Sequence, residues 1–355
     1  MTMPECLCII MVIIVRIKEQ GMNNMKIFKR ILALLTAMIM LVSFAACGDT
    51  GSVGETEEST TSYIREEKTK IASLSGAMGM SLAKLTADRD YAYEVTSYAD
   101  PEQAADQIKN GTADIALLPV NTAATLYNET NGAIKILAIN TLSTLYVLEN
   151  GESIKSADDL KGKTVYTVGK GTSAEHIINR AFSDVTVEYK NDFNEITALT
   201  DEGKADICIL TEPAAASVIA SGKGMRRALS ISDEWNKICG TPLVQSVVVA
   251  RNEYIEQKPE YVSTFLMHNE LSLNYINANL GAGAETFLFE SKYFESEELA
   301  AATAPYCNLK FIKGEEMKTA VKAVLDMLNQ ADPALIGGEV PDDGFYYSES
   351  VAAAE

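Results

Sequence analysis

The chain has 355 residues, of which 47% are apolar, so it is long enough to form two domains with sizeable cores. Its formal net charge of −19 excludes the basic surface that nucleic-acid phosphates require, and we expect no nucleic-acid partner. Only two histidines occur, His176 and His268, and no cysteine–histidine cluster has metal-ligand spacing. We therefore expect no metal site and no cofactor.

The N-terminal segment has the pattern of a secretory signal. After Met25, three basic residues precede an uncharged apolar run over 31–46. We take Met25 or Met22 as the true start, so that residues 1–46 comprise a leader and a signal peptide. The ending AAC resembles a bacterial lipobox, in which Cys47 is diacylated and becomes the first residue, although Phe44 stands where leucine is usual. An unmodified thiol after a simple signal is the alternative.

Residues 47–67 are rich in Gly, Ser, Thr and Glu, which predicts a flexible tether. Of the three later cysteines, Cys208 lies in an apolar run and is predicted to be a buried thiol. A disulfide between Cys239 and Cys307 stays open at this point, because an odd number of cysteines defines no framework.

A regular alternation of strands and helices begins at residue 68. We predict strands at 71–75, 93–98, 115–120, 134–140 and 143–150, with a helix after the first strand. A second helix has Asp100 as N-cap, with Gln103 closing a capping box, and ends near 110–111. The stretch 115–120 is continuously apolar and is predicted to be buried on both faces.

The same design then recurs. Strands are predicted at 164–168, 185–190, 207–213, 227–232 and 243–250, with helices at 174–182 and from Asp192 to 203. GTADI at 111–115 and GKADI at 203–207 match at an offset of 92. Two copies of one βαβαβ unit predict an α/β fold with parallel sheets and right-handed crossovers, while the remainder to about 330 is mostly helical. Ligands of such sheets bind at the carboxyl edges of the strands.

Several segments together carry a family resemblance: SLSGAMGM at 73–80, GTADIALLPVNTAATLY at 111–127, DLKGKTV at 159–165 and KADICILTEPAAASV at 204–218. Over residues 68–345 the chain resembles substrate-binding proteins of bacterial ABC importers, in the nitrate/sulfonate/taurine and thiamine-pyrimidine (SsuA/THI5-like) group. This resemblance implies a type II periplasmic-binding fold, with two lobes joined by crossing strands at 143–150 and 243–250. We assign 68–149 plus 251–345 to lobe 1 and 150–250 to lobe 2.

The loops after the strands are the expected ligand site, because they present amides and hydroxyls at helix N-termini. The segment 169–174 also fits the dinucleotide pattern G-x-G-x-x-A, but a secreted chain with a duplicated unit favours a simple anion-binding turn. Glu212 either contacts ligand or caps the following helix. The predicted ligand-binding residues are Ser75, Gly76, Ala77, Met78, Gly79, Asn121, Thr122, Gly169, Lys170, Gly171, Thr172, Ser173, Thr211 and Glu212.

The resemblance implies a monomeric lipoprotein on the extracytoplasmic face of the cell membrane. It would close on a small polar solute, such as a sulfonate, another organic anion or a pyrimidine-like precursor, and deliver it to an ABC permease. No catalytic residue is predicted. A synthase on the same fold is the enzyme alternative, against which the signal and the shortage of histidines count. A ligand-sensing pair of lobes is the third hypothesis.

Overall fold

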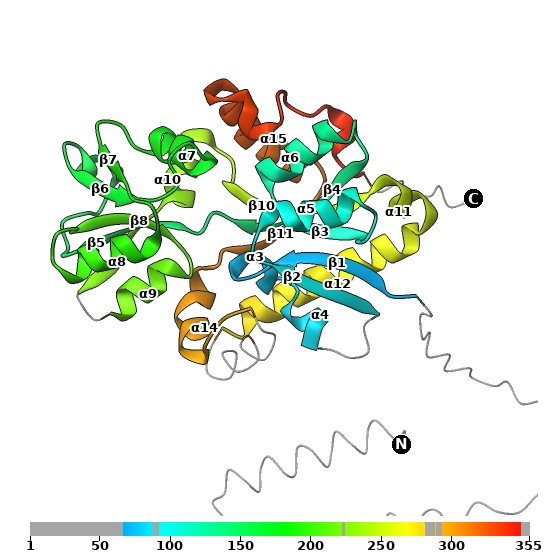
Figure 1. The fold of residues 1–355 in the computed structure, drawn as a ribbon, viewed down its shortest axis with the longest axis horizontal. Coiled ribbons are helices and arrows are strands. Elements are labelled where there is room, and N and C mark those ends of the chain that lie inside the picture. The colour runs from blue at the N-terminus through cyan, green and yellow to red at the C-terminus, as the bar shows by residue number, and fades with distance from the viewer. Residues whose placement is uncertain (1–66, 88–91, 222–223, 281–287, 289–292, 349–355) are drawn as a thin grey trace, which may run out of the picture. The chain divides into compact units, whose positions relative to one another are not determined.

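The computed structural model describes residues 67–87, 92–221, 224–280, 288 and 293–348 (Figure 1). The predicted leader and signal peptide, Cys47 and the tether up to residue 66 lie outside the described residues. No helix in the described ranges is both long and apolar enough to span a bilayer.

The first sheet has six strands in the order β11-β4-β10-β3-β1-β2. β1 is parallel to β2 and β3, while β10 is antiparallel to β3 and β4, and β11 is antiparallel to β4. The strands are β1 (Thr69–Leu74), β2 (Tyr93–Tyr98), β3 (Ile115–Pro119), β4 (Ile134–Leu142), β10 (Val244–Arg251) and β11 (Leu309–Ile312).

The second sheet has five strands in the order β7-β6-β8-β5-β9. β6 is parallel to β7 and β8, and β5 is antiparallel to β8 and β9. The strands are β5 (Leu145–Asn150), β6 (Thr164–Thr167), β7 (Thr186–Tyr189), β8 (Ile207–Thr211) and β9 (Met225–Ser230).

The two sheets repeat one topology, as the duplicated sequence predicts. β2-β1-β3 in one sheet corresponds to β7-β6-β8 in the other, and each parallel set is followed by an antiparallel strand. That strand comes from the other half of the chain: β10 follows the second copy and β5 follows the first. The α/β prediction is therefore confirmed, with mixed rather than wholly parallel sheets. The reason is that each lobe borrows a strand that arrives from the opposite direction.

The helices follow the strands in the predicted order (Figure 1). The α-helices are α3 (Ala77–Met80), α4 (Ala83–Ala87), α5 (Pro101–Lys109), α6 (Val120–Glu129), α7 (Ser173–Ala181), α8 (Phe193–Asp201), α9 (Ala214–Ala220), α10 (Ile231–Cys239), α11 (Asn252–Gln257), α12 (Pro259–Ala278), α14 (Glu297–Thr303) and α15 (Gly314–Ala331). Four short 3₁₀ turns are described: η1 (Ala157–Leu160), η2 (Ala304–Tyr306), η3 (Pro333–Ile336) and η4 (Asp343–Phe345).

The predicted N-caps of α5 and α8 are present. The Asp100 carboxylate accepts a bond from Glu102 N at 2.9 Å, and the Asp192 carboxylate accepts one from Glu195 N at 2.9 Å. The capping box that we predicted through Gln103 does not form, because Asp100 bonds the N2 amide instead of the N3 amide. These caps fix where the two equivalent helices begin.

Three details of the sequence prediction change. The segment 227–232 is not all strand, because Ser230 ends β9 and N-caps α10 through its hydroxyl, 3.3 Å from Asp233 N. Neither β11 nor α14 was predicted from the sequence. β5 belongs to the second sheet although it precedes residue 150, and the lobe boundaries stay a prediction.

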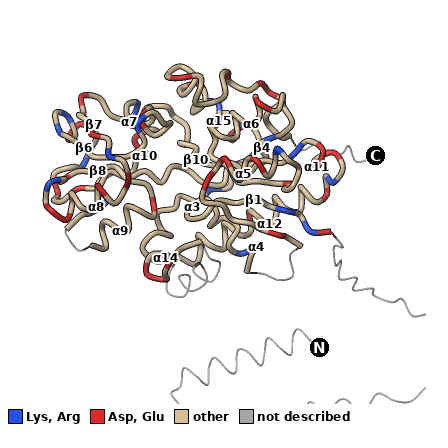
Figure 2. The backbone as a smooth tube through the Cα atoms, viewed as in Figure 1, with Lys and Arg blue, Asp and Glu red and all other residues tan. Residues whose placement is uncertain are grey.

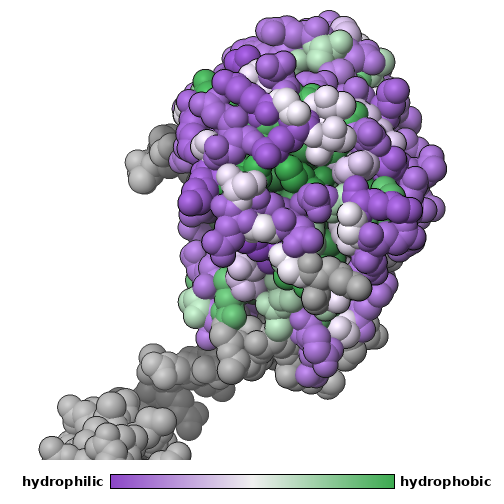
Figure 3. Space-filling model, turned by 90° about the vertical axis from the view of Figure 1, so that its left-hand side faces the viewer, coloured by the Kyte–Doolittle hydropathy of each residue, from purple (hydrophilic) through white to green (hydrophobic). Residues whose placement is uncertain are grey.

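The cores are mostly aliphatic, with some aromatic residues, and lie on both faces of each sheet. Trp235 and the predicted buried thiol Cys208 are both fully buried. Burial raises the pKa of the Cys208 thiol to about 12. Cys239 and Cys307 are free thiols, so the structure contains no bond between them. Figure 3 shows the end of the molecule that carries the second sheet, where a mostly hydrophilic surface surrounds an apolar hollow.

Candidate functional site

A cavity of about 200 Å³ lies where the carboxyl ends of β3 and β8 meet the segments that cross between the sheets. Both copies of the repeated unit contribute to it, as strand-edge sites in α/β sheets require. Its lining comprises Met78, Pro119, Val120, Asn121, Ser143, Leu145, Ser173, Ala174, Ile177, Thr211, Val244, Gln245, Val324 and Leu328.

The crossing segments supply Ser143 and Gln245. The Gln245 side-chain oxygen accepts bonds from Thr144 N at 2.8 Å and from the Thr144 hydroxyl at 3.0 Å. Because the backbone amide of Thr144 can only donate, this contact fixes which end of the Gln245 amide is oxygen. The –NH₂ group of Gln245 is left to donate elsewhere, at the cavity wall.

Of the predicted site residues, four line the cavity: Met78, Asn121, Ser173 and Thr211. The last three bring side-chain donors and acceptors from both copies of the unit. Among the described residues, none of these three side chains is bonded to another protein group, so each has hydrogen-bonding capacity for a solute. Met78 adds an adaptable apolar wall.

Most groups of the loop after β1 are used in hydrogen bonds and packing within the protein. Ser75 is exposed and its amide donates to Tyr98 O at 3.0 Å, while the Gly76 amide donates to Tyr293 O at 3.1 Å. Ala77 and Gly79 are buried, and a Cβ at Gly79 would lie 1.9 Å from Leu74 O. Within this loop only Met78 reaches the cavity.

The loop after β6 uses several of its donors in hydrogen bonds within the loop itself. Gly169 and Gly171 have φ of 87° and 78°, a region in which glycine is unstrained. The Gly171 amide donates to Glu175 Oε2 at 2.6 Å, and the Thr172 hydroxyl donates to Gly169 O at 2.7 Å while accepting from Ala174 N. Lys170, Gly171 and Thr172 are exposed, and of the loop only Ser173 lines the cavity. The donors that we expected to face a ligand are thus partly used within the loop.

Two further predicted residues lie elsewhere. Thr122 lines a neighbouring groove of about 430 Å³ between α5, α6 and η3. Glu212 is buried, and its carboxylate accepts from Arg227 Nε at 2.7 Å and from Ala216 N at 3.1 Å. The bond to Ala216 is the helix-capping role that the sequence left as one alternative. Burial raises the pKa of Glu212, and Arg227 acts against that rise.

Arg227 is an unpredicted part of this arrangement. Its guanidinium lies 3.6 Å from the ring centroid of Tyr306, in cation–π contact. The Tyr146 hydroxyl donates to Tyr306 O at 3.0 Å. Leu145 lines the cavity and Tyr146 follows it in β5, so these contacts lie on the opposite face of the second sheet. The segment around η2 therefore contacts the face of the second sheet that points away from the cavity.

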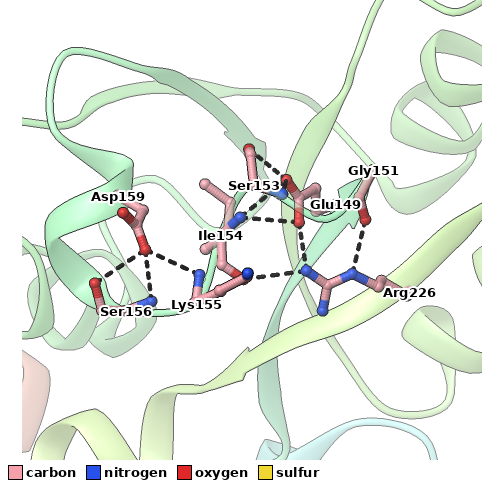
Figure 4. Close-up of polar contacts among 8 residues, drawn as sticks. All are labelled: Glu149, Gly151, Ser153, Ile154, Lys155, Ser156, Asp159 and Arg226. Carbon is pink, nitrogen blue, oxygen red and sulfur yellow. Dashed lines mark hydrogen bonds and ion pairs between the residues drawn. The ribbon is translucent and has the colours of Figure 1, made fainter.

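A second polar cluster surrounds Glu149, near the far end of β5 (Figure 4). Its carboxylate accepts from the Ser153 amide and hydroxyl and from the Ile154 amide, and pairs with Arg226 at 2.7 Å. Figure 4 also shows Asp159 bonded to the Lys155 amide and to Ser156, with which it forms the capping box at the start of η1. All of these groups satisfy one another, so the cluster is structural.

The residues missed by sequence reasoning fall into two kinds. Gln245 interrupts the apolar run LVQSVVVA, and that lone amide was a usable signal. Val324 and Leu328, on one face of α15, carry no such signal because they look like any core residues of an amphipathic helix. In the described ranges, no group of three or more His, Cys, Asp or Glu is placed to hold a metal.

Comparison with known proteins identifies the family. Residues 88–279 match the model of the NMT1/THI5-like family, so the chain belongs to that family. No curated protein matches the chain.

Solved structures share the fold. An ABC transporter from Parabacteroides distasonis superposes with a TM-score of 0.68 at 22% identity, covering 80% of this chain and 100% of the other. The periplasmic aliphatic sulphonate binding protein SsuA from Escherichia coli gives 0.62 at 16% identity, covering 79% and 92%. The alkanesulfonate-binding protein SsuA from Xanthomonas axonopodis pv. citri, bound to MOPS, gives 0.53 at 14% identity, covering 78% and 94%. The predicted type II periplasmic-binding fold is thereby confirmed.

Proposed function

We propose that this member of the NMT1/THI5-like family is the solute-binding component of an ABC importer. It binds a small polar solute between its two sheets and delivers that solute to the transmembrane permease. The observation that carries the proposal is the cavity itself, which takes hydrogen-bonding side chains from both copies of the repeat and from both crossing segments. Similar solved structures, which include an ABC transporter and sulfonate-binding proteins, support this role.

The mature protein starts at Cys47 in this proposal and is held by acyl chains at the extracytoplasmic face of the membrane. Residues 47–67 form the tether that lets the binding domain reach the permease. We also propose that the protein acts as a monomer and closes on its solute by rotation about the crossing segments 143–144, between β4 and β5, and 240–245, from the end of α10 into β10. Contacts divided between two lobes are complete only in a closed form, so the solute would shift the population towards it.

The enzyme alternative has less support. Among the described residues that line the cavity there is no histidine, cysteine, aspartate or glutamate, so general acid–base or nucleophilic chemistry has no evident group there. His268 is bonded to the Tyr93 hydroxyl at 2.8 Å on α12, away from the cavity. This distribution favours binding over catalysis.

The test is a thermal-shift screen of the full chain against sulfonates, carboxylates, nitrate, pyrimidines and amides. A solute that binds the folded state raises the melting temperature. At a hundred times its Kd it adds about 2.7 kcal/mol to the free energy of unfolding. Asn121→Ala should lower the affinity for that solute at least tenfold, because Asn121 lines the cavity. Thr122→Ala is the matched control, since Thr122 lines only the outer groove and should bind normally. Equal effects of the two variants would remove the cavity from the binding site.

A further inference from the structure

We propose that the cavity takes an uncharged solute with an aliphatic body and an amide-like or hydroxylated edge. We further propose that the negative charge of Glu175 disfavours the binding of anions. The inference rests on the proposed function, because it assigns a chemical class to the solute of that same cavity.

The cavity has no cation with which to hold an anion. None of the described residues that line it is charged, and none is aromatic. The crossing segments 143–144 and 240–245 carry no charged residue and appear tan in Figure 2. Lys170, the cation nearest in sequence, is exposed and does not line the cavity. A buried anion without a cationic partner is strongly disfavoured.

Helix dipoles do not replace the missing cation. α6 and α7 both begin at the cavity, and each N-terminus acts as roughly half a positive charge. Glu175 lies in the first turn of α7 and its carboxylate accepts the Gly171 amide at 2.6 Å, which places a full negative charge at that end. That charge opposes the dipole of α7 directly, so an anionic solute gains little from this helix N-terminus.

Three backbone amides of the loop after β6 are also already engaged. The Gly171 amide donates to Glu175, the Thr172 amide to Gly169 O, and the Ala174 amide to the Thr172 hydroxyl. A sulfonate would have to displace the carboxylate of Glu175 from its own loop. Glu175 therefore competes directly with an anion for the Gly171 amide.

What remains suits a neutral solute. The Gln245 –NH₂ group donates, Asn121 both donates and accepts, and the hydroxyls of Ser173 and Thr211 do either. Aliphatic walls such as Leu145 and Leu328 face this polar set. A dry cavity of about 150 Å³ accommodates benzene, so about 200 Å³ holds a somewhat larger compact body.

The experiment compares three probes with one carbon skeleton: butyramide, butyrate and butane-1-sulfonate. Each is titrated into the full chain at fixed ionic strength, and binding is followed by NMR of backbone amides. We expect butyramide to bind, with shifts at Thr211 and Ser173, and both anions to bind at least tenfold more weakly. Glu175→Gln keeps an acceptor for the Gly171 amide, and it should improve butane-1-sulfonate binding several-fold while leaving butyramide unchanged.

Glu202→Gln is the control for net charge. Glu202 pairs with Lys204 at 2.7 Å where α8 ends, before β8 begins, at the opposite edge of the sheet. This variant should bind all three probes as the wild type does. Wild-type preference for either anion, or no gain of sulfonate binding in Glu175→Gln, overturns the charge inference and leaves the importer role standing. Absence of butyramide binding overturns the neutral-solute inference as well, whereas the importer role is refuted only if the wider thermal-shift screen finds no solute.

Discussion

Replacing Arg227 by methionine should destabilise the fold more than the same change at its neighbour Arg226. The side chain of Glu212 is fully buried, and that of Arg227 is 14% exposed. Arg227→Met keeps most of the aliphatic volume but leaves Glu212 with one partner, the Ala216 amide at 3.1 Å. Removing one partner of a buried ion pair costs about 3–5 kcal/mol of unfolding free energy, because the other charge stays buried without compensation.

Arg226 is the matched comparison, one position earlier in β9. It pairs with Glu149, whose side chain is also buried, but Arg226 itself is 37% exposed. After Arg226→Met, Glu149 still accepts the Ser153 amide, the Ser153 hydroxyl and the Ile154 amide. Screening by water and these remaining donors reduce the expected loss to about 1–2 kcal/mol.

The two defects should also respond differently to pH. Burial raises the pKa of Glu212 above its ordinary 4.5, against the opposing effect of Arg227, so its stabilising contribution is complete below 4.5 and is lost as pH rises through the folded pKa. Removing Arg227 raises that pKa further. The defect of Arg227→Met is therefore full at pH 7 and shrinks as the pH falls towards 4.5.

Glu149 behaves in the opposite way. Burial alone would raise its pKa, but the bonds from Ser153 and Ile154 and the charge of Arg226 together hold it below 4.5. Its contribution is present above 4.5 and is lost only as pH falls through that lower pKa. The defect of Arg226→Met should therefore be constant between pH 7 and pH 4.5.

Urea unfolding followed by circular dichroism at pH 7, 6, 5 and 4.5 measures all of these differences. The slope of unfolding free energy against urea must stay the same in each variant for the comparison to hold. Equal losses in the two variants at pH 7 would refute the reasoning, and so would a defect of Arg227→Met that grows on acidification.

Two other predictions concern the glycine loops and the anchor. Gly79→Ala should destabilise by several kcal/mol, because its Cβ would lie 1.9 Å from Leu74 O and 2.6 Å from the Tyr293 ring; Gly171→Ala, with open space and a φ of 78°, should cost about 1–2 kcal/mol. Equal melting temperatures of these variants would contradict that ranking. Cys47→Ser should move the protein from the membrane to the soluble fraction on cell fractionation, since one atom carries every acyl chain. A variant that stays on the membrane would exclude acylation at Cys47 as its anchor.

Most of the fold was predictable because its determinants are local. Asp100 and Asp192 cap equivalent helices, and the continuously apolar runs that became β3 and β8 lie at the centres of their sheets. The mixed character of the sheets was not visible in either copy alone. It depends on β5 and β10 each pairing with a strand of the other half, as Val147 does with Ile209 and Val247 with Leu118.

The site was less predictable, because a glycine-rich loop can use its hydrogen-bond donors within the protein and not for a ligand. The sequence 75–79 has the same glycine-rich character as 169–173, yet Gly79 is packed against Tyr293 and Gly171 is exposed. Nothing in the sequence of the two loops separates these outcomes, because the burial of Gly79 depends on Tyr293, which is distant in the chain. Gln245 was more accessible to prediction, because an amide in an apolar strand needs a partner.

The duplication explains why the cavity exists, and the divergence of the two copies explains what it selects. In the first copy Gly79 is packed against Tyr293 and the loop contributes only Met78 to the cavity, so the start of α6 offers the polar groups. In the second copy the loop stays exposed, but Glu175 occupies the amide of Gly171. Neither copy retains a free glycine loop for an anion, and polar recognition passes to Asn121, Thr211 and the crossing-segment residue Gln245. Because Gln245 is bonded to Thr144 in the other crossing segment, a solute held by its –NH₂ group is attached directly to the residues about which the lobes would turn.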